Sequence, residues 1–176
     1  RMGWLIDKTV IAKATKLVVS GKLVSTNKLQ IAAWYAGVPI VLPKYVEAVC
    51  SKTKGESGTV QTLSLDEYLV SESSAAFRGE KPNPQLWSSC NYISAAGTND
   101  EEIVSMASCA GASAVPCDSV KAVDKVLGSL PHCFSLSGTK KLQKHMKASG
   151  VLMLSASNMA KSLLNQVLPT DPKGKT

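Results

Sequence analysis

The first part of the chain opens with hydrophobic segments that are separated by a polar turn. Residues 14–20 are mostly apolar and stop at Gly21, a pattern typical of a β-strand. A shorter apolar stretch, residues 3–7, is a second strand candidate. Beyond the turn the apolar positions follow the spacing of one helix face, and Ser25 or Thr26 is the expected N-cap of that helix.

The predicted helix ends at Gly37, where the pattern changes to a short strand and then to another helix. Residues 38–42 are rich in β-branched side chains and lack polar alternation, which indicates a strand buried on both faces. Pro43 suits the first turn of a helix, and residues 44–50 continue it. The pattern therefore predicts the order strand, helix, strand, helix.

Residues 51–87 lose this regularity and are expected to connect two folded parts. The stretch 51–58 has the polar, glycine-containing composition of a loop, and 71–85 is rich in Ser, Gly and Pro, as linkers are. Between these stretches, Ser64 is the expected cap of a short helix over residues 64–69.

A second α/β pattern begins near residue 88. Strands that alternate with helices predict a mainly parallel sheet with helices on both faces. The expected strands are residues 90–95, 113–117, 132–137 and 151–155, and the expected helices are 99–110, 118–130 (helical or irregular), 139–149 and 157–168. The predicted boundaries are a first unit over 1–50, a linker over 51–87, a second unit over 88–168 and a tail over 169–176.

The two units share a local pattern in which a strand is followed by Thr-x-Lys, a helix, a glycine and another strand. It comprises Thr26, Lys28 and Gly37 in the first unit, and Thr139, Lys141 and Gly150 in the second. This internal repetition indicates two copies of one fold in tandem.

These motifs resemble a tandem BRCT module. The second unit resembles a complete BRCT repeat, and the first resembles the later part of one, from the strand at residues 3–7 onward. The resemblance implies an α/β fold of two units, each a mainly parallel four-stranded sheet flanked by helices, with the first unit incomplete at its N-terminus. Kinetoplastid kinetochore proteins and checkpoint scaffolds both carry such C-terminal modules, and this divergent, basic sequence resembles the former.

The resemblance implies that the first strand and first helix of the first unit come from residues before Arg1. In an alternative alignment, residues 17–21 are themselves that first strand. The former alignment is preferred because residues 37–48 match the late strand–helix junction of the family. The aromatic anchor of the family's last helix corresponds to Tyr45 in the first unit and to Met159 in the second.

BRCT repeats commonly bind phosphoserine or phosphothreonine peptides through a lysine and a hydroxyl at the start of this helix. The resemblance places the phosphate at Thr26 and Lys28, with Ser25 nearby, and the alternative alignment adds Ser20 and Gly21 as the phosphate-binding pair. The competing interpretation is that Thr26 is only a helix cap and Lys28 only one of many surface lysines.

The second unit offers an equivalent set of phosphate-binding candidates. It consists of Gly97, Thr98, Thr139 and Lys141. The first repeat usually binds the phosphate in tandem modules, so the first-unit residues are preferred.

Charge is distributed in three blocks around a net value of +7. Residues 1–54 and 119–176 each hold nine basic and two acidic residues, whereas 55–118 hold two basic and nine acidic residues. Basic surfaces fit a phosphorylated peptide, a nucleic acid or an acidic protein. One predicted helix carries a basic face that is expected to be merely solvated, with nucleic-acid contact as the alternative; its lysines are Lys140, Lys141, Lys144 and Lys147.

Other function classes find little support in the sequence. The five cysteines contain no Cys-x-x-Cys pair, which predicts reduced thiols in a nucleus or cytosol and no zinc site. No nucleophile–base arrangement, signal peptide or membrane span is evident, so we expect no enzyme, cofactor, small-molecule substrate or membrane partner. The predicted function is phosphorylation-dependent protein binding in a nuclear, chromosome-associated assembly (kinetochore or DNA damage). The alternatives are a phosphate-independent scaffold and a nucleic-acid-binding module.

Overall fold

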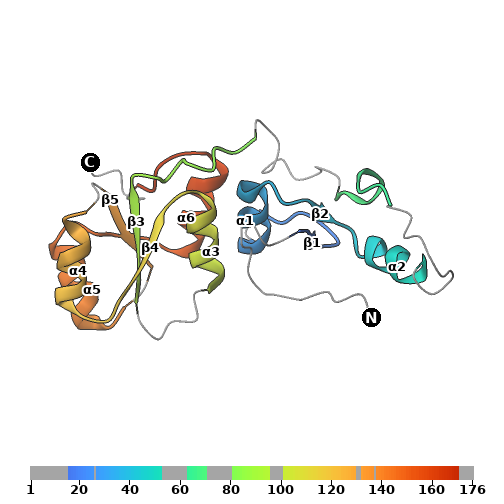
Figure 1. Cartoon of the computed structure of the whole chain (residues 1–176). Coiled ribbons are helices and arrows are strands. Elements are labelled where there is room, and N and C mark those ends of the chain that lie inside the picture. Colours follow the sequence, from blue (N-terminus) through green and yellow to red (C-terminus); the bar gives the residue numbers. More distant parts are fainter. Residues whose placement is uncertain are drawn as a thin grey trace.

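The computed structural model describes residues 16–25, 27–52, 63–70, 81–95, 101–129, 132–136 and 138–170. Two separate parallel sheets, one in each half of the chain, are accompanied by helices (Figure 1). This arrangement confirms the predicted α/β class with parallel sheets.

The first unit contains two short parallel strands within the residues that the structure describes. Val18 pairs with Ile40, and the bridge between Val41 and Leu69 adds an antiparallel contact at the other edge of the second strand. The predicted order of elements is confirmed, and the strand candidate at residues 3–7 lies outside the described residues. The elements are β1 (Val18–Val19), α1 (Lys28–Ala36), β2 (Ile40–Val41), α2 (Pro43–Lys52) and the 3-10 turn η1 (Asp66–Tyr68).

The cap of α1 differs from the prediction. Neither Ser25 nor Thr26 is the N-cap: the helix begins one residue later, at Asn27, whose side-chain oxygen accepts a hydrogen bond from the Gln30 amide at 3.1 Å. Asparagine caps as well as serine does, since its side-chain oxygen reaches the same free N–H groups. Lys28 is therefore the first helical residue.

The predicted cap at Ser64 is also wrong. Only the three residues of η1 are helical, and no side-chain hydrogen bond caps them. The turn is closed by the backbone bond from the Tyr68 amide to the Leu65 carbonyl at 2.9 Å. The Leu42 amide then donates to the Tyr68 carbonyl at 2.8 Å and the Val70 amide to the Ile40 carbonyl at 2.9 Å, so the chain runs extended beside β2 directly after η1.

The second unit is a four-stranded parallel sheet in the order β4-β3-β5-β6. Helices α3 and α6 pack in a core with Tyr92 and Phe134, while α4 and α5 pack in a separate core with Ile93. Because Tyr92 and Ile93 point to opposite faces of β3, the helices cover both faces, as predicted. The elements are β3 (Cys90–Ala95), α3 (Glu101–Cys109), β4 (Ser113–Cys117), α4 (Val120–Leu127), β5 (His132–Ser135), α5 (Lys140–Ala148), β6 (Leu152–Met153) and α6 (Ala156–Leu164).

The internal repeat is visible in how α1 and α5 end. Gly37 and Gly150 both adopt left-handed backbone angles, with φ of 65° and 81°. In both units the amide of the next residue, Val38 or Val151, donates to the carbonyl five residues earlier at 2.9 Å. This hydrogen bond closes the last turn of each helix. The chain then enters a strand that pairs in parallel with the strand before the helix. β1 thus corresponds to β5, which supports the preferred alignment of the first unit.

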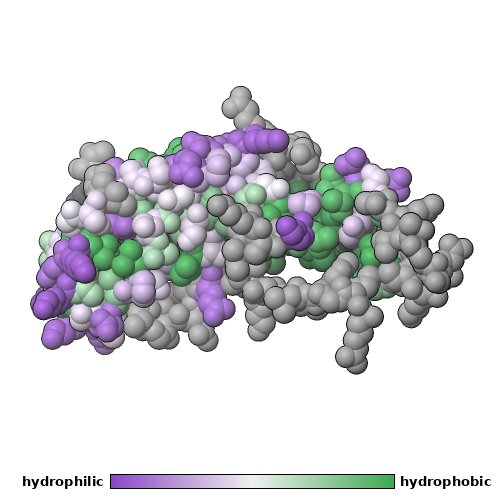
Figure 2. Space-filling model, in the orientation of Figure 1, coloured by the Kyte–Doolittle hydropathy of each residue, from purple (hydrophilic) through white to green (hydrophobic). Residues whose placement is uncertain are grey.

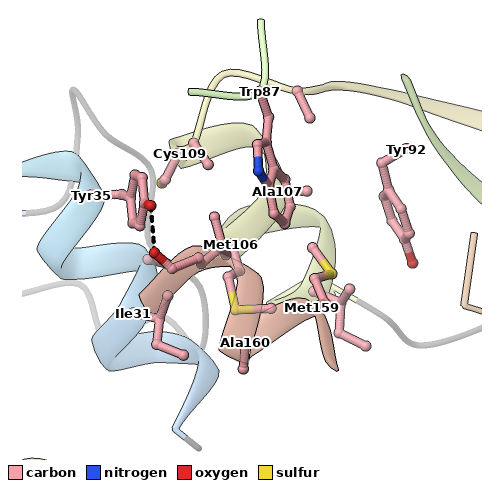
Figure 3. Close-up of a cluster of buried hydrophobic side chains, with 14 of the residues drawn as sticks. Ile31, Tyr35, Trp87, Tyr92, Met106, Ala107, Cys109, Met159 and Ala160 are labelled. Atoms are coloured by element: carbon pink, nitrogen blue, oxygen red, sulfur yellow. Dashed lines mark hydrogen bonds between the residues drawn. The ribbon is translucent and has the colours of Figure 1, made fainter. Parts of the chain in front are cut away.

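Helix α1 joins the two units. Its residues Ile31, Ala32, Ala33 and Tyr35 are buried and belong to one continuous core that extends from β1 to α3 and α6. In Figure 3, Ile31 points toward side chains of α3 and α6. A helix that is apolar around most of its circumference is stable only between two layers, and α1 has the second unit on one side and its own sheet on the other.

Part of the range predicted as a linker is packed against this core. Trp87 is fully buried, its ring lies edge-on to Phe134 with centroids 5.1 Å apart, and its indole N–H donates to the Val167 carbonyl at 3.0 Å. Its backbone amide donates to the Ala110 carbonyl at 2.8 Å. The chain is therefore anchored to the second unit just before β3.

Gly111, after α3, is where backbone crowding should matter most. Its φ is +97°, and a Cβ there would lie 2.9 Å from the Pro84 carbonyl oxygen and 3.1 Å from Gln85 Cα. We expect Gly111→Ala to lower the free energy of unfolding by at least about 1–2 kcal/mol, since left-handed strain alone costs that much. Gly21→Ala is the matched control, because nothing lies within 4 Å of its added Cβ. Urea unfolding measures both, and equal midpoints would contradict this account.

Candidate functional site

The candidate site lies where α1 and α3 begin. Lys28 is the first residue of α1, Glu102 is in the first turn of α3, and the Lys28 Nζ lies 3.4 Å from the Glu102 Oε2. Both side chains are partly exposed, at 33% and 51%. The ion pair links the first turns of two packed helices, and the N-terminus of a helix carries a positive partial charge. Such a place favours an anion.

A buried glutamine organises the loop that leads into Lys28. The Gln30 side chain is 1% exposed, and its amide nitrogen donates to the Ser20 hydroxyl at 2.7 Å and to the Lys22 carbonyl at 2.8 Å. Its amide oxygen accepts from the backbone of Val24 at 2.6 Å. These bonds satisfy the buried amide and fix the path of residues 20–24 relative to α1.

The structure places the predicted first-unit residues around this loop. Ser20 is half-buried and its hydroxyl also donates to the Lys22 carbonyl at 2.9 Å, while Gly21 is exposed. Ser25 is half-buried, two residues before the cap of α1, and Thr26 lies outside the described residues. Lys28 is the predicted residue whose charged group the structure places at the junction between the units.

The second-unit candidates lie elsewhere. Thr139 is the N-cap of α5, with its hydroxyl accepting from the Leu142 amide at 3.3 Å, and Lys141 is exposed in the first turn. Gly97 and Thr98 lie outside the described residues. Because α5 packs in the core on the opposite face of the sheet from α3 and α1, the two candidate sets do not form one site.

A buried tyrosine joins α1 to α6 on the other side of the junction. The Tyr35 hydroxyl donates to the Leu163 carbonyl at 2.7 Å (Figure 3). Burial raises the pKa of Tyr35 well above its ordinary value, so the phenol stays protonated and remains a donor. Leu163 is in the last turn of α6, and its carbonyl also accepts a hydrogen bond from the Gln166 amide at 2.9 Å.

Sequence reasoning missed Gln30, Tyr35 and Glu102. The two residues in α1 had a visible indication, since a glutamine and a tyrosine within an otherwise apolar helix must find partners when that helix is buried. Glu102 had none, because its contact with Lys28 is a long-range product of how the units pack.

Four of the five thiols are unsuited to nucleophilic chemistry. Burial raises the pKa of Cys90, Cys109, Cys117 and Cys133, which keeps these thiols protonated near neutral pH, and the thiolate is the reactive form. Within the described ranges, no three His, Cys, Asp or Glu side chains gather as ligands for a metal ion. None of the helices in the described part of the chain has the length and apolar character needed to cross a membrane.

Comparison with known proteins supports the fold. The chain is similar to the crystal structure of the BRCT5–BRCT6 domains of S. pombe Brc1, with a TM-score of 0.51 and 12% sequence identity over 89% of this chain and 81% of that one. No protein-family model and no curated protein sequence matches the chain. The fold is therefore that of a tandem BRCT pair, at a sequence distance where the likeness concerns the fold alone.

Removing the Tyr35 hydroxyl should weaken the contact between α1 and α6. We expect Tyr35→Phe to lower the free energy of unfolding by about 0.5–1.5 kcal/mol for the lost bond, with no further cost at the Leu163 carbonyl, because it keeps its bond from the Gln166 amide. Urea unfolding gives the change, and amide hydrogen exchange should show faster exchange at the ends of α1 and α6. Tyr45→Phe in α2, where the ring is partly buried against Tyr68, is the control, and an equal effect there would contradict the role assigned to Tyr35.

The buried thiols and Tyr35 also predict a pH dependence of stability. Each has a folded-state pKa above its ordinary value, so the unfolded chain releases these protons at lower pH than the folded chain does. These groups should therefore leave the free energy of unfolding unchanged below about pH 8 and should lower it as the pH rises past the ordinary thiol and phenol pKa values of about 8.5 and 10. Tyr35→Phe should flatten the fall above about pH 10. A free energy of unfolding that stays constant up to about pH 11 in the original chain would contradict this prediction.

Proposed function

We propose that this chain is a phosphorylation-dependent protein-interaction module whose phosphate site centres on Lys28. The observation that carries the proposal is the position of Lys28: it opens α1 and extends its ammonium to the place where α3 also begins. A phosphate there would meet a cation and the free N–H groups of two helices.

The pairing of Lys28 with Glu102 does not prevent this binding. An exposed ion pair contributes about 0–1 kcal/mol, whereas each hydrogen bond to a charged group contributes about 1.5–3 kcal/mol. A phosphoserine or phosphothreonine carries close to two negative charges at neutral pH and three acceptor oxygens. A phosphate can therefore displace the Glu102 carboxylate from the ammonium.

The other first-unit candidates surround this centre in the proposal. Ser20, Gly21, Ser25 and Thr26 precede Lys28 in the loop and would supply hydroxyl and backbone donors to the phosphate. The flanking peptide residues would lie across the junction of α1 and α3, where contacts from both units give specificity. The second-unit set of Gly97, Thr98, Thr139 and Lys141 is a secondary location.

We also propose a biological setting for this interaction. The partner is a phosphorylated protein, and the setting is a nuclear, chromosome-associated assembly such as a kinetochore or a DNA-damage complex. The module acts without catalysis and without a cofactor. The similarity to two BRCT domains of S. pombe Brc1 supports the tandem arrangement on which this function depends.

A phosphopeptide titration of isotope-labelled protein tests the site. With an immobilised library of phosphoserine and phosphothreonine peptides to select a ligand, we expect amide shifts concentrated at residues 20–30. Lys28→Met should weaken binding at least about tenfold, because a charge-assisted bond is lost. Lys161→Met, which removes an exposed lysine from α6, is the control. Full affinity of Lys28→Met, or shifts concentrated around Thr139 and Lys141, would contradict the proposal.

Removing the carboxylate beside Lys28 should change the affinity for the phosphopeptide in the opposite direction. Glu102→Gln removes a negative charge that repels the phosphate and competes for the ammonium, so we expect tighter binding of the same phosphopeptide. Calorimetry at low and at high salt should show the gain shrinking as salt rises. Weaker binding of Glu102→Gln would mean that the carboxylate positions Lys28 instead of competing with the ligand.

A phosphate-independent scaffold is the second candidate function. The same ion pair favours it, since Lys28 already has a counter-charge in the absence of any ligand. Under this alternative, the affinity for a partner is unchanged when the partner is treated with phosphatase. Under the proposed function, that treatment abolishes binding.

A further inference from the structure

The second unit carries a strongly basic surface that the phosphate site does not use. Helices α4 and α5 lie side by side, joined by the His145 Nε2 and Asp124 Oδ1 atoms at 2.7 Å. Their apolar residues point inward to the core, and their lysines point outward to solvent. We call this surface the α4–α5 lysine face; its exposed lysines are Lys121, Lys125, Lys140, Lys141, Lys144 and Lys147.

The lysines on this face reinforce one another. Lys140, Lys144 and Lys147 are spaced along one stripe of α5, and Lys121 and Lys125 form a stripe on α4. Neighbours in a stripe are about 5–6 Å apart at Cβ, well within the screening length of about 8 Å at physiological salt. Across both helices the single acidic residue is Asp124, which already faces His145.

The face lies away from the junction between the units. Helix α1 packs against the α3 and α6 side of the sheet, whereas α4 and α5 cover the other side. In Figure 2 hydrophilic residues gather over the end of the molecule that α4 and α5 form. A ligand could therefore occupy this face while Lys28 holds a phosphopeptide.

We propose that the α4–α5 lysine face binds the phosphodiester backbone of a nucleic acid. A polymer with closely spaced phosphates fits a broad field of lysines, and each lysine that neutralises a phosphate releases a counterion. Without aromatic side chains on either helix, no base stacking is available, so the binding is independent of sequence.

The composition of the face disfavours the other polyanionic partners. Firm binding to a membrane surface usually adds apolar side chains that enter the bilayer beside the lysines, and protein interfaces usually have an apolar or aromatic centre. The large hydrophobic residues that are strongly exposed in the described part of the chain lie elsewhere; they are Val19, Leu69, Val167 and Leu168. The face therefore offers positive charge without an apolar centre. Positive charge is also what binds the phosphate backbone of nucleic acids.

The salt dependence of binding tests the proposal. The probe is a fluorescein-labelled DNA duplex of about 20 base pairs, a length that covers both helices, followed by fluorescence anisotropy. If the six lysines each neutralise a phosphate, affinity should fall about 10³-fold between roughly 50 and 200 mM salt. The test variant combines four substitutions on the face: Lys121→Gln, Lys125→Gln, Lys144→Gln and Lys147→Gln. It retains Lys140 and Lys141, so its affinity should fall only about tenfold over the same range of salt.

A matched variant controls for net charge. It removes four exposed lysines outside the face and should keep the steep salt dependence of the original chain. Its substitutions are Lys16→Gln, Lys22→Gln, Lys44→Gln and Lys161→Gln. An equal loss in both variants would overturn the proposal, because binding would then follow net charge alone.

Further binding measurements distinguish the possible ligands of this face, and they distinguish this proposal from the proposed phosphate site. Duplex RNA that binds like DNA supports the backbone assignment, whereas tighter binding of phosphatidylserine vesicles or of polyglutamate at equal charge overturns it. Lys28→Met should leave DNA binding unchanged, so the phosphate site and the lysine face can fail independently. Circular dichroism melting of each variant confirms that a loss of binding is not a loss of fold.

Discussion

The structure depends on the burial of one helix, α1, between the sheet of its own unit and helices α3 and α6 of the second unit. Four of its nine residues are apolar side chains removed from water, and the small side chains among them, Ala32 and Ala33, let neighbouring backbones approach closely. Burial of an isoleucine alone is worth about 1.5–3 kcal/mol. That stabilisation is lost if either unit withdraws, so the two units share a core instead of merely touching.

The candidate site is a by-product of this shared core. Packing α1 beside α3 brings their first turns together, and the ion pair between Lys28 and Glu102 marks that meeting point. Gln30 stabilises the same place, because the hydrogen bonds of its buried side-chain amide hold the preceding loop against the helix. Geometry at the site is thus set by apolar packing below it and by a neutral hydrogen-bond network beside it.

Much of the fold could be predicted from the sequence because its signals are local. The apolar runs located the strands, and Gly37 and Gly150 marked the ends of α1 and α5, where a left-handed residue is required. The start of α1 was misplaced by one or two residues, because Ser25, Thr26 and Asn27 are all good caps and the backbone chooses among them. Ser64 failed for a related reason: a capping residue has no effect where tertiary contacts allow only three helical residues.

The candidate site was less predictable. Lys28 could be singled out from the Thr-x-Lys repeat, but Glu102 is far from it in sequence, and nothing local indicates that contact. Tyr35 and Leu163 are likewise joined only through packing of the units. Contacts between units depend on how two surfaces fit together, which one-dimensional patterns do not encode.

The shared helix also changes what the covalent connection between the units must do. Side chains from α1, α3 and α6 hold their mutual orientation, which leaves to the covalent connection the task of keeping the units close. It raises the effective concentration of one unit near the other, a quantity that varies only slowly with length. Relatives of this chain could therefore lengthen or shorten that segment freely while keeping the same arrangement of domains.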